Sequence, residues 1–289
     1  MIPIHRGLAE LAEGYDGFIV DLWGVLHDGI EAFPPAVACL EALRRRSKRI
    51  CILSNAPRRA EEVAGKCAEL GIAPALWDLV MSSGEETWQH LARRTDPWYR
   101  ALGRRCYHLG PERDWGMRDG LDYDFVDEPE AADFVLCTGA DGPDDRVADY
   151  EARLAAARAR DLPMVCANPD LEVIRGGRRE ICAGAIARRY EEQGGRVRYH
   201  GKPAREIYDR CLDLLDGAPR SRFAAIGDSL RTDIAGATNA GIDAIFITGG
   251  VQGEELGADP EGNVDPERLR AACRTAGQRP VAALPALRW

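Results

Sequence analysis

Short apolar runs alternate with helix-like stretches through the first hundred residues, and this alternation limits the possible folds more than any other feature. The runs at 18–20, 50–53 and 79–82 favour buried strands. Apolar side chains recur at helical spacing across 35–46 and 59–70. Strands separated by helices in this way pair in parallel. The sequence therefore predicts an α/β fold, a Rossmann-like doubly wound parallel sheet with helices on its faces.

A second alternating pattern occupies the middle of the chain. Strands are expected at 105–109, 134–137 and 164–167, and helices near 144–160 and 181–193. A stretch of this length with its own alternation predicts an inserted α/β domain over 98–199.

The pattern of the first part resumes after this insertion. Strands are expected at 223–226 and 244–248, and a helix near 266–273. The sequence therefore predicts a discontinuous core domain, made of residues 1–97 plus 200–289. Binding sites occur preferentially between such domains.

Composition excludes several classes of function. The chain has 289 residues, 45% of them hydrophobic and 29% charged, as in soluble globular proteins. Its formal net charge of -9 argues against nucleic acid as a partner. No apolar run approaches the ~20 residues that span a bilayer, and no secretory leader is visible, so a cytoplasmic location is expected. Nine scattered cysteines without close pairing are expected to be small buried side chains in a reducing compartment.

Polar side chains stand where strands end. Asp21 follows the run at 18–20, and Gly24 allows the backbone to turn directly afterwards. Ser54 and Asn55 end the run that begins at residue 50. Ligands of open α/β sheets bind at the carboxyl ends of strands, so these positions predict a common site.

Three further charged residues continue this series. Lys202 precedes a helix-like stretch that starts near residue 204, and Asp228 and Asp233 follow the strand at 223–226. Each residue taken alone would be read as a turn or helix cap. Together, in this order, they indicate one active site.

These residue types suit phosphoryl transfer. Asp21 would attack a phosphoryl group and form an aspartyl-phosphate. Mg²⁺ would be held by Asp21, Asp228 and Asp233, together with one backbone carbonyl from the turn after Asp21, that of Trp23. Lys202 would neutralise charge on the transferring group. The hydroxyl of Ser54, with Asn55 beside it, would hydrogen-bond the phosphoryl oxygens.

The chain resembles the haloacid dehalogenase-like superfamily, specifically class IIA, the branch of nucleotide, sugar-phosphate and 4-nitrophenyl phosphate phosphatases. The resemblance covers nearly the whole chain. It is carried by four segments in order: Asp21-Leu22-Trp23-Gly24-Val25, Leu53-Ser54-Asn55, Gly201-Lys202-Pro203, and Gly227-Asp228 through Asp233. Further matches are Cys166-Ala167-Asn168-Pro169-Asp170, Asn239-Ala240-Gly241 and Thr248-Gly249-Gly250.

The resemblance implies a role for the insertion. In class IIA it is a cap domain that closes over a small phosphorylated metabolite, and its loops set specificity. Asn168 and Asp170 would then face the substrate, although an Asn-Pro-Asp turn explains the same residues. Many class IIA members self-associate through the cap, so a homo-oligomer is a candidate assembly.

Trp23 departs from the pattern of the family. Phosphatases of this family carry a second aspartate there, which protonates the leaving oxygen and then deprotonates the attacking water. An indole does neither. Because such acid–base catalysis contributes ~10²–10⁴-fold, hydrolysis of plain alkyl phosphates is expected to be slow.

Four interpretations remain open at this stage. The enzyme acts on phosphates with good leaving groups, or takes its acid from elsewhere, for example from His27, Asp28 or the cap. Alternatively it is a metal-independent dehalogenase-like hydrolase, which Asp228 and Asp233 argue against. Finally, it is a catalytically impaired scaffold that binds a phosphorylated ligand. A Mg²⁺-dependent phosphatase-type hydrolase is the preferred hypothesis.

Overall fold

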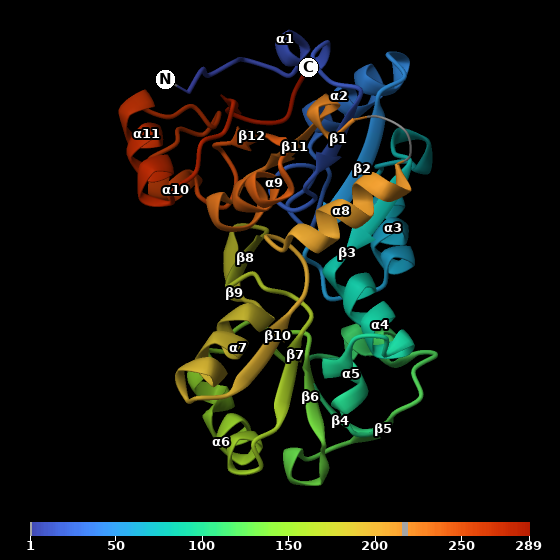
Figure 1. Ribbon diagram of the computed structural model, residues 1–289. Coiled ribbons are helices and arrows are strands. Elements are labelled where there is room, and N and C mark those ends of the chain that lie inside the picture. The colour runs from blue at the N-terminus through green and yellow to red at the C-terminus, as the bar shows by residue number, and fades with distance from the viewer. Residues whose placement is uncertain (1, 216–218) are drawn as a thin grey trace.

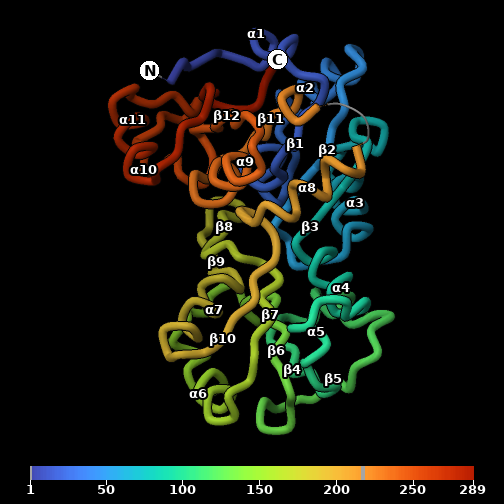
Figure 2. The backbone as a smooth tube through the Cα atoms, viewed as in Figure 1, coloured from blue at the N-terminus to red at the C-terminus, as the bar shows by residue number. Residues whose placement is uncertain are grey.

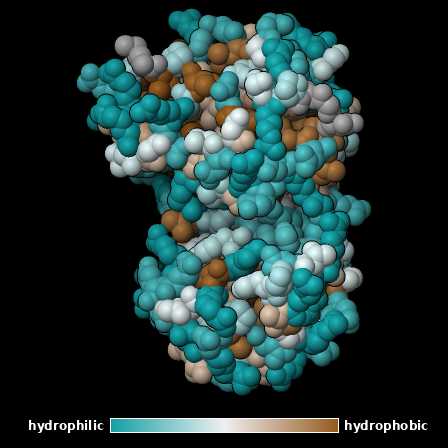
Figure 3. All heavy atoms as spheres, in the orientation of Figure 1, coloured by the Kyte–Doolittle hydropathy of each residue, from teal (hydrophilic) through white to brown (hydrophobic). Residues whose placement is uncertain are grey.

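The structure, a computed structural model, describes residues 2–215 and 219–289. It has two lobes, each built on its own parallel sheet (Figure 1). The face seen in Figure 3 is mostly hydrophilic, with apolar residues scattered over it. No helix in the described part of the chain is long and apolar enough to cross a bilayer.

The larger lobe holds a six-stranded sheet in the order β13-β12-β11-β1-β2-β3, with every neighbouring pair parallel. Its strands are β1 (Gly17–Val20), β2 (Arg49–Ser54), β3 (Leu79–Ser82), β11 (Phe223–Gly227), β12 (Asp243–Ile247) and β13 (Ala282–Leu284). From β1 the chain winds outward through β2 and β3, and later it winds the other way from β11. The strand order therefore reverses between β1 and β11, the place where such sheets bind ligands.

Alternating side chains of the central strands separate two hydrophobic cores. Phe18 and Val20 enter the core beneath α2 (Pro34–Arg45) and α3 (Ala60–Glu69), while Ile19 enters the other core. That second core is covered by α8 (Arg205–Leu214), α9 (Ala235–Ala240) and α11 (Pro266–Thr275). With helices on both faces, the sheet is doubly wound as the sequence predicts.

The smaller lobe holds a five-stranded parallel sheet in the order β10-β7-β6-β4-β5. Its strands are β4 (Arg105–Leu109), β5 (Asp124–Val126), β6 (Phe134–Cys137), β7 (Pro163–Cys166) and β10 (Arg196–Tyr199). One face packs on α6 (Glu151–Ala159) and α7 (Ala183–Glu192), the other on α4 (Ser83–Arg93) and α5 (Pro97–Ala101). The predicted fold class, an α/β core with an α/β insertion, is confirmed.

An antiparallel hairpin extends from the smaller lobe toward the larger one (Figure 1). It consists of β8 (Glu172–Arg175) and β9 (Arg178–Ile181). Gly176 and Gly177 form its turn with φ of 51° and 78°, in the left-handed region where glycine is favoured. The N–H of Gly176 donates to the carbonyl of Asp28 at 3.3 Å, so the hairpin contacts the loop after β1.

The chain crosses between the lobes twice, and the two crossings lie together. Helix α4 leads out from β3, and residues 200–204 lead back from β10 to α8 (Figure 2). The predicted limits of the inserted domain, 98 and 199, fall near these crossings and remain a prediction.

The described helices agree with the expected ranges within a few residues. The exception is the stretch 144–160, which starts as a 3-10 turn at Val147–Tyr150 and becomes α-helical only from Glu151; the N–H of Arg146 donates to Asp149 at the start of that turn. Other short elements are α1 (Ala9–Ala12), α10 (Gly253–Leu256), a π-helical turn (Leu230–Ile234) and 3-10 turns at Pro74–Leu76, Glu112–Arg118, Pro129–Ala131 and Arg220–Arg222. All nine cysteines are buried and free, as expected.

Candidate active site

Three aspartates meet at the point where the order of the large sheet reverses. Asp21 directly follows β1, and Asp228 directly follows β11; Asp233 lies in the turn at Leu230–Ile234. Each offers a carboxylate oxygen, and these oxygens lie within 4.8 Å of one another. All three side chains are buried. The structure therefore brings together the carboxylates that the sequence predicts as metal ligands.

Glycines make room for Asp228. A Cβ atom at Gly24, where φ is 75°, or at Gly250 would clash with the Asp228 carboxylate. The N–H of Val251 donates to Oδ2 of Asp228 at 2.7 Å. Asp228 thus accepts from a loop, and it is not the N-cap of the turn at Leu230–Ile234. Ser229 caps that turn by accepting from the N–H of Thr232 at 3.3 Å.

Lys202 is the cation of the site. Its Nζ pairs with Oδ1 of Asp21, lies 2.7 Å from Oδ1 of Asp233, and donates to the carbonyl of Leu53 at 3.1 Å. Burial alone would lower the pKa of the ammonium group, but Asp21 and Asp233 outweigh it and raise the pKa well above its usual range. Lys202 is therefore charged and fixed against Asp21.

Burial acts oppositely on the aspartates. Burial and the charge of Asp233 raise the pKa of Asp21 to about 7, while Lys202 opposes that rise. Burial, Asp21 and Asp233 also raise the pKa of Asp228 well above its usual value. Three carboxylates facing one ammonium carry a formal charge of -2 when all are ionised. One divalent cation would therefore balance the formal charge of the site.

The side chain of Asn55 ties three segments together. Its Oδ1 accepts from the N–H of Lys202 at 2.8 Å, and its Nδ2 donates to the carbonyl of Lys202 at 3.2 Å. Nδ2 also donates to Oδ1 of Asp170 in the smaller lobe at 3.0 Å. Asn55 thus fixes the loop of Lys202, a role that its predicted contact with phosphate did not include.

Ser54 ends β2 beside Lys202 and is almost fully buried. Its Oγ accepts from the N–H of Ala56 at 3.2 Å. This contact uses the oxygen of the hydroxyl and leaves its proton available to a phosphoryl oxygen. The catalytic role predicted for Ser54 remains a prediction.

The two cap candidates behave differently. Oδ1 of Asn168 accepts from the N–H of Asp170 at 2.9 Å, which is the Asx-turn considered as the alternative for this segment. Asp170 reaches the larger lobe, where it contacts Asn55 and lies 3.8 Å from Nη2 of Arg231. Arg231 also donates to the carbonyl of Pro169 at 2.7 Å. These contacts place the predicted substrate loop at the site without testing its role.

Trp23 lies between the lobes. Cζ of Arg175, from the hairpin, is 5.0 Å from the centroid of its ring, and His27 meets the ring edge to face at 4.8 Å between centroids. A Cβ at Gly29 would clash with the indole. The predicted use of the Trp23 carbonyl as a metal ligand stays a prediction.

Neither His27 nor Asp28, the two nearby groups considered as a general acid, is suited to that role. Nδ1 of His27 accepts from the N–H of Gly29 at 2.8 Å, and burial lowers the pKa of His27 to about 4. Asp28 is half-buried. Hydrogen bonds from the N–H groups of Glu31 and Ile30 lower its pKa, so it is ionised at neutral pH. At pH 7 neither group holds a proton that it can deliver.

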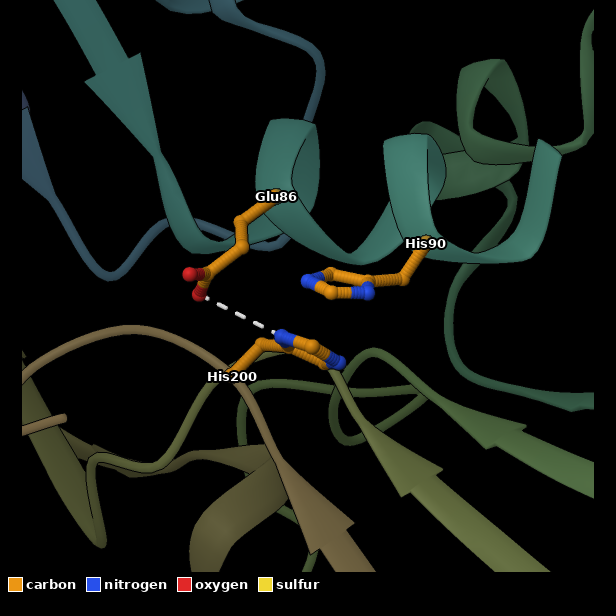
Figure 4. A group of neighbouring side chains, drawn as sticks. All are labelled: Glu86, His90 and His200. Atoms are coloured by element: carbon orange, nitrogen blue, oxygen red, sulfur yellow. Dashed lines mark ion pairs between the residues drawn. The ribbon is translucent and has the colours of Figure 1, made fainter. Parts of the chain in front are cut away.

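A second polar cluster, which sequence reasoning missed, lies where the chain crosses between the lobes (Figure 4). Glu86 and His90 extend from α4, and His200 comes from the return crossing. Two signals could have indicated it: Glu86 and His90 share a helix face at i, i+4, and His200 stands two residues before Lys202.

Comparisons with known proteins agree with this geometry. The family described as haloacid dehalogenase-like hydrolase matches residues 18–123, and a second, HAD-hydrolase-like family matches residues 199–269. The crystal structure of a haloacid dehalogenase-like hydrolase from Brucella suis 1330 is 36% identical. It superposes with a TM-score of 0.84 over 98% of this chain and 99% of that one.

Two curated relatives are more distant in sequence. The chain is 26% identical to an acid sugar phosphatase of Staphylococcus saprophyticus over 84% of this chain and 90% of that protein. It is 25% identical to the 5'-nucleotidase YutF of Bacillus subtilis over 83% of this chain and 90% of that protein. The chain belongs to the haloacid dehalogenase-like hydrolase superfamily, in its class IIA branch, and the resemblance drawn from the sequence is confirmed.

Proposed function

We propose that this protein is a Mg²⁺-dependent phosphatase that hydrolyses a small phosphorylated metabolite through an aspartyl-phosphate on Asp21. The enzyme class predicted from the sequence, a phosphoric ester hydrolase of the HAD type, is also that of the curated relatives, an acid sugar phosphatase and a 5'-nucleotidase. The observation that carries the proposal is the convergence of Asp21, Asp228 and Asp233 around Lys202.

The residues present fit a magnesium ion. Mg²⁺ prefers oxygen ligands and is usually held by one or two carboxylates plus phosphate and water. Asp21, Asp228 and Asp233 offer buried carboxylate oxygens within 4.8 Å of one another, and Lys202 alone does not balance their charge. When bound, the ion would supply positive charge that draws together the nucleophile and the phosphoryl oxygens.

The reaction would proceed in two displacements at phosphorus, with Asp21 as the nucleophile of the first and the leaving group of the second. A carboxylate oxygen of Asp21 attacks phosphorus, and the bond from phosphorus to the leaving oxygen breaks. Water then attacks phosphorus, and the bond from phosphorus to the Asp21 oxygen breaks. Inorganic phosphate leaves with the protons of the water, and the Asp21 carboxylate is restored. Lys202 keeps the attacking carboxylate oriented and neutralises charge on the phosphoryl group. The hydroxyl of Ser54 and the neighbouring backbone N–H groups supply hydrogen bonds to it.

Trp23 narrows the range of substrates in this proposal. The leaving oxygen departs without a carboxylic acid at position 23, and the pKa values of His27 and Asp28 leave an uncharged imidazole and a carboxylate at neutral pH, neither of which is a general acid. Substrates with weakly basic leaving groups, such as acyl or aryl phosphates, need little protonation. They are therefore the proposed preference within the phosphatase class.

The partners named from the sequence remain proposals. The substrate is a small phosphorylated metabolite that Asn168 and Asp170 would contact from the cap, and the assembly is a homo-oligomer formed through the cap. The proposal involves neither nucleic acid nor membrane, and it assumes a cytoplasmic setting.

A phosphate-release screen tests the proposal. Purified protein is assayed with acetyl phosphate, 4-nitrophenyl phosphate, sugar phosphates and nucleoside monophosphates, with Mg²⁺ or with EDTA. We expect Mg²⁺-dependent release from acetyl and 4-nitrophenyl phosphate and much slower release from the alkyl esters. Asp21→Asn should abolish it. Asp16→Asn, at the opposite end of the same strand, should not.

Three results would overturn the proposal. Metal-independent halide release from a haloacid would identify a dehalogenase-like hydrolase. Saturable binding of phosphate esters without turnover would identify an impaired scaffold. Undiminished phosphate release by Asp21→Asn would remove Asp21 as the nucleophile.

A further inference from the structure

The carboxylate of Glu86 joins the two crossings between the lobes. Glu86 lies in the first two turns of α4, and its Oε2 accepts from the N–H of Gly201 at 2.8 Å. The same oxygen lies 3.3 Å from Nδ1 of His200, as the dashed line in Figure 4 marks. The side chains of Glu86 and His200 are each only 6% exposed. A buried carboxylate in this place needs both of its donors.

The rest of the cluster defines what Glu86 does. Nε2 of His200 is hydrogen-bonded to the hydroxyl of Tyr99. With that hydroxyl donating, the proton of a neutral His200 stands on Nδ1 and is donated to Glu86; this assigns the tautomer from the network. Burial raises the pKa of Glu86, but the hydrogen bonds from His200 and Gly201 outweigh it, so the net shift is downward. Glu86 is thus a fixed acceptor.

The backbone that Glu86 holds belongs to the active-site loop. Gly201 directly precedes Lys202, whose own N–H and carbonyl are both held by Asn55. The backbone of this segment is therefore hydrogen-bonded by two side chains, by Glu86 at residue 201 and by Asn55 at residue 202. The backbone at Gly201 is closely packed: its φ is 97°, and a Cβ there would clash with Asn55 and Ser83.

We propose that Glu86 is a positioning residue for Lys202: it fixes the backbone of Gly201 so that Nζ of Lys202 stands between Asp21 and Asp233. This rests on the proposed phosphatase function. Lys202 acts on the transferring phosphoryl group, so a displacement of its Nζ raises the barrier to transfer more than it weakens binding. A misplacement of about 1 Å can cost ~10²-fold in rate.

A metal ion is the other interpretation of the same three side chains. Glu86, His90 and His200 each offer a ligand atom, and these atoms lie within 4.8 Å of one another. However, the rings of His90 and His200 lie one over the other, with centroids 4.8 Å apart and an angle of 31° between their planes (Figure 4). Nitrogen lone pairs lie in the ring planes, and two planes tilted by 31° at this separation do not direct their lone pairs at one point between the rings. The oxygen of Glu86 is also already engaged, and both features favour positioning.

The test compares two substitutions of similar size at residue 86. Glu86→Gln keeps an oxygen that accepts from the N–H of Gly201, whereas Glu86→Met removes it. With 4-nitrophenyl phosphate and Mg²⁺, we expect the Gln variant to keep kcat within about 3-fold of wild type. For the Met variant we expect kcat to fall ~10–100-fold while KM changes less than about 3-fold. His90→Phe preserves the stack without touching Gly201 and should match wild type.

Crystal structures of the same variants give a readout that does not depend on turnover. Nζ of Lys202 should remain against Asp21 and Asp233 in the Gln variant and leave that position in the Met variant. If wild type shows no phosphatase activity, the proposed function fails, and the position of Lys202 still decides the role of Glu86. Should Glu86→Met not fold, His200→Phe, which removes the donor that orients Glu86, is measured in its place with the same expected direction.

Two outcomes would overturn this proposal. Equal kcat and an unmoved Lys202 in Glu86→Met would show that Glu86 does not position the loop. One equivalent of a transition metal in the purified protein, lost in His90→Phe, would show that the cluster is a metal centre.

Discussion

The guanidinium of Arg175 lies over the indole of Trp23, with Cζ 5.0 Å from the centroid of the ring. Arg175 belongs to the hairpin of the smaller lobe, and Trp23 lies two residues beyond Asp21 in the larger lobe. Trp23, which stands where the resemblance implies a second aspartate, is therefore part of the contact between the lobes. Its ring is also flanked by His27 and Gly29.

Trp23→Asp should restore hydrolysis of alkyl phosphates. A carboxylic acid at position 23 would protonate the leaving oxygen, and the rate on sugar phosphates should rise by ~10²-fold or more. Loss of the half-buried indole should also lower stability, by less than the ~3–5 kcal/mol that truncation of a fully buried Trp costs. The measurement is kcat/KM across esters of increasing leaving-group basicity, with unfolding followed in parallel.

Trp23→Phe is the matched control, since it reduces the ring without supplying an acid. It should lose stability and gain no activity on alkyl esters. A folded Trp23→Asp protein with unchanged rates would mean that the absent acid does not limit turnover.

Asp228→Asn should weaken Mg²⁺ binding. The substitution keeps the shape of the side chain and its bond from Val251 but removes one of the three charges that converge at the site. We expect at least a tenfold loss of affinity, which corresponds to about 1.4 kcal/mol. Isothermal titration with MgCl₂ measures it, and Asp141→Asn in the other lobe should bind as wild type does. Unchanged affinity in Asp228→Asn would exclude Asp228 as a ligand.

Gly250→Ala should disrupt the same metal site by displacing the carboxylate of Asp228. The new Cβ would clash with the carboxylate of Asp228 and displace it from Val251. Both Mg²⁺ affinity and phosphate release should fall. Gly65→Ala, inside α3 with open space around it, is the control and should instead gain up to about 1 kcal/mol of stability. Normal Mg²⁺ affinity in Gly250→Ala would show that the loop shifts to accommodate the added methyl group and that glycine is not required at position 250.

Acid should destabilise the protein partly through His27. Burial lowers the pKa of His27 to about 4, below the ~6.5 of an exposed histidine. Between those values the unfolded chain binds the proton and the folded chain does not. The stability that His27 contributes is therefore complete above pH 6.5 and is lost as the pH falls toward 4, at up to about 1.4 kcal/mol per pH unit. Urea unfolding of wild type and His27→Gln at pH 7, 6 and 5 measures the slope, which should be shallower in the variant. Equal slopes would place the titrating group elsewhere.

The sequence allowed the fold and the charged centre of the site to be predicted for a clear physical reason. Parallel strands carry unbroken apolar runs, and residues that follow such runs converge at one edge of the sheet. Asp21 and Asp228 each follow a strand of one predicted parallel sheet, so a common site could be anticipated; the adjacency of the two strands is seen in the structure. Lys202 and Asp233 could be added because their motifs recur in a known order.

Contacts between the lobes could not be anticipated in the same way. The hairpin with Arg175 carries a Gly-Gly turn signal, yet nothing in its sequence says that it reaches Trp23. The contact of Asn55 with phosphate stays a prediction, but its hydrogen bonds to Lys202 and Asp170 could not be anticipated, because a side chain with both donors and an acceptor takes whatever partners the tertiary fold supplies. Glu86 and His200 are 114 residues apart, and only the docking of two crossings brings them together.

Because all nine thiols are buried, their reaction with an alkylating reagent reports local unfolding of the protein. Burial raises the pKa of Cys51, in the large sheet, and of Cys137, in the small one, so alkylation must wait until the surrounding lobe loosens. Identifying which cysteine is labelled first in mild denaturant would show which lobe unfolds first, and it would need no introduced probe.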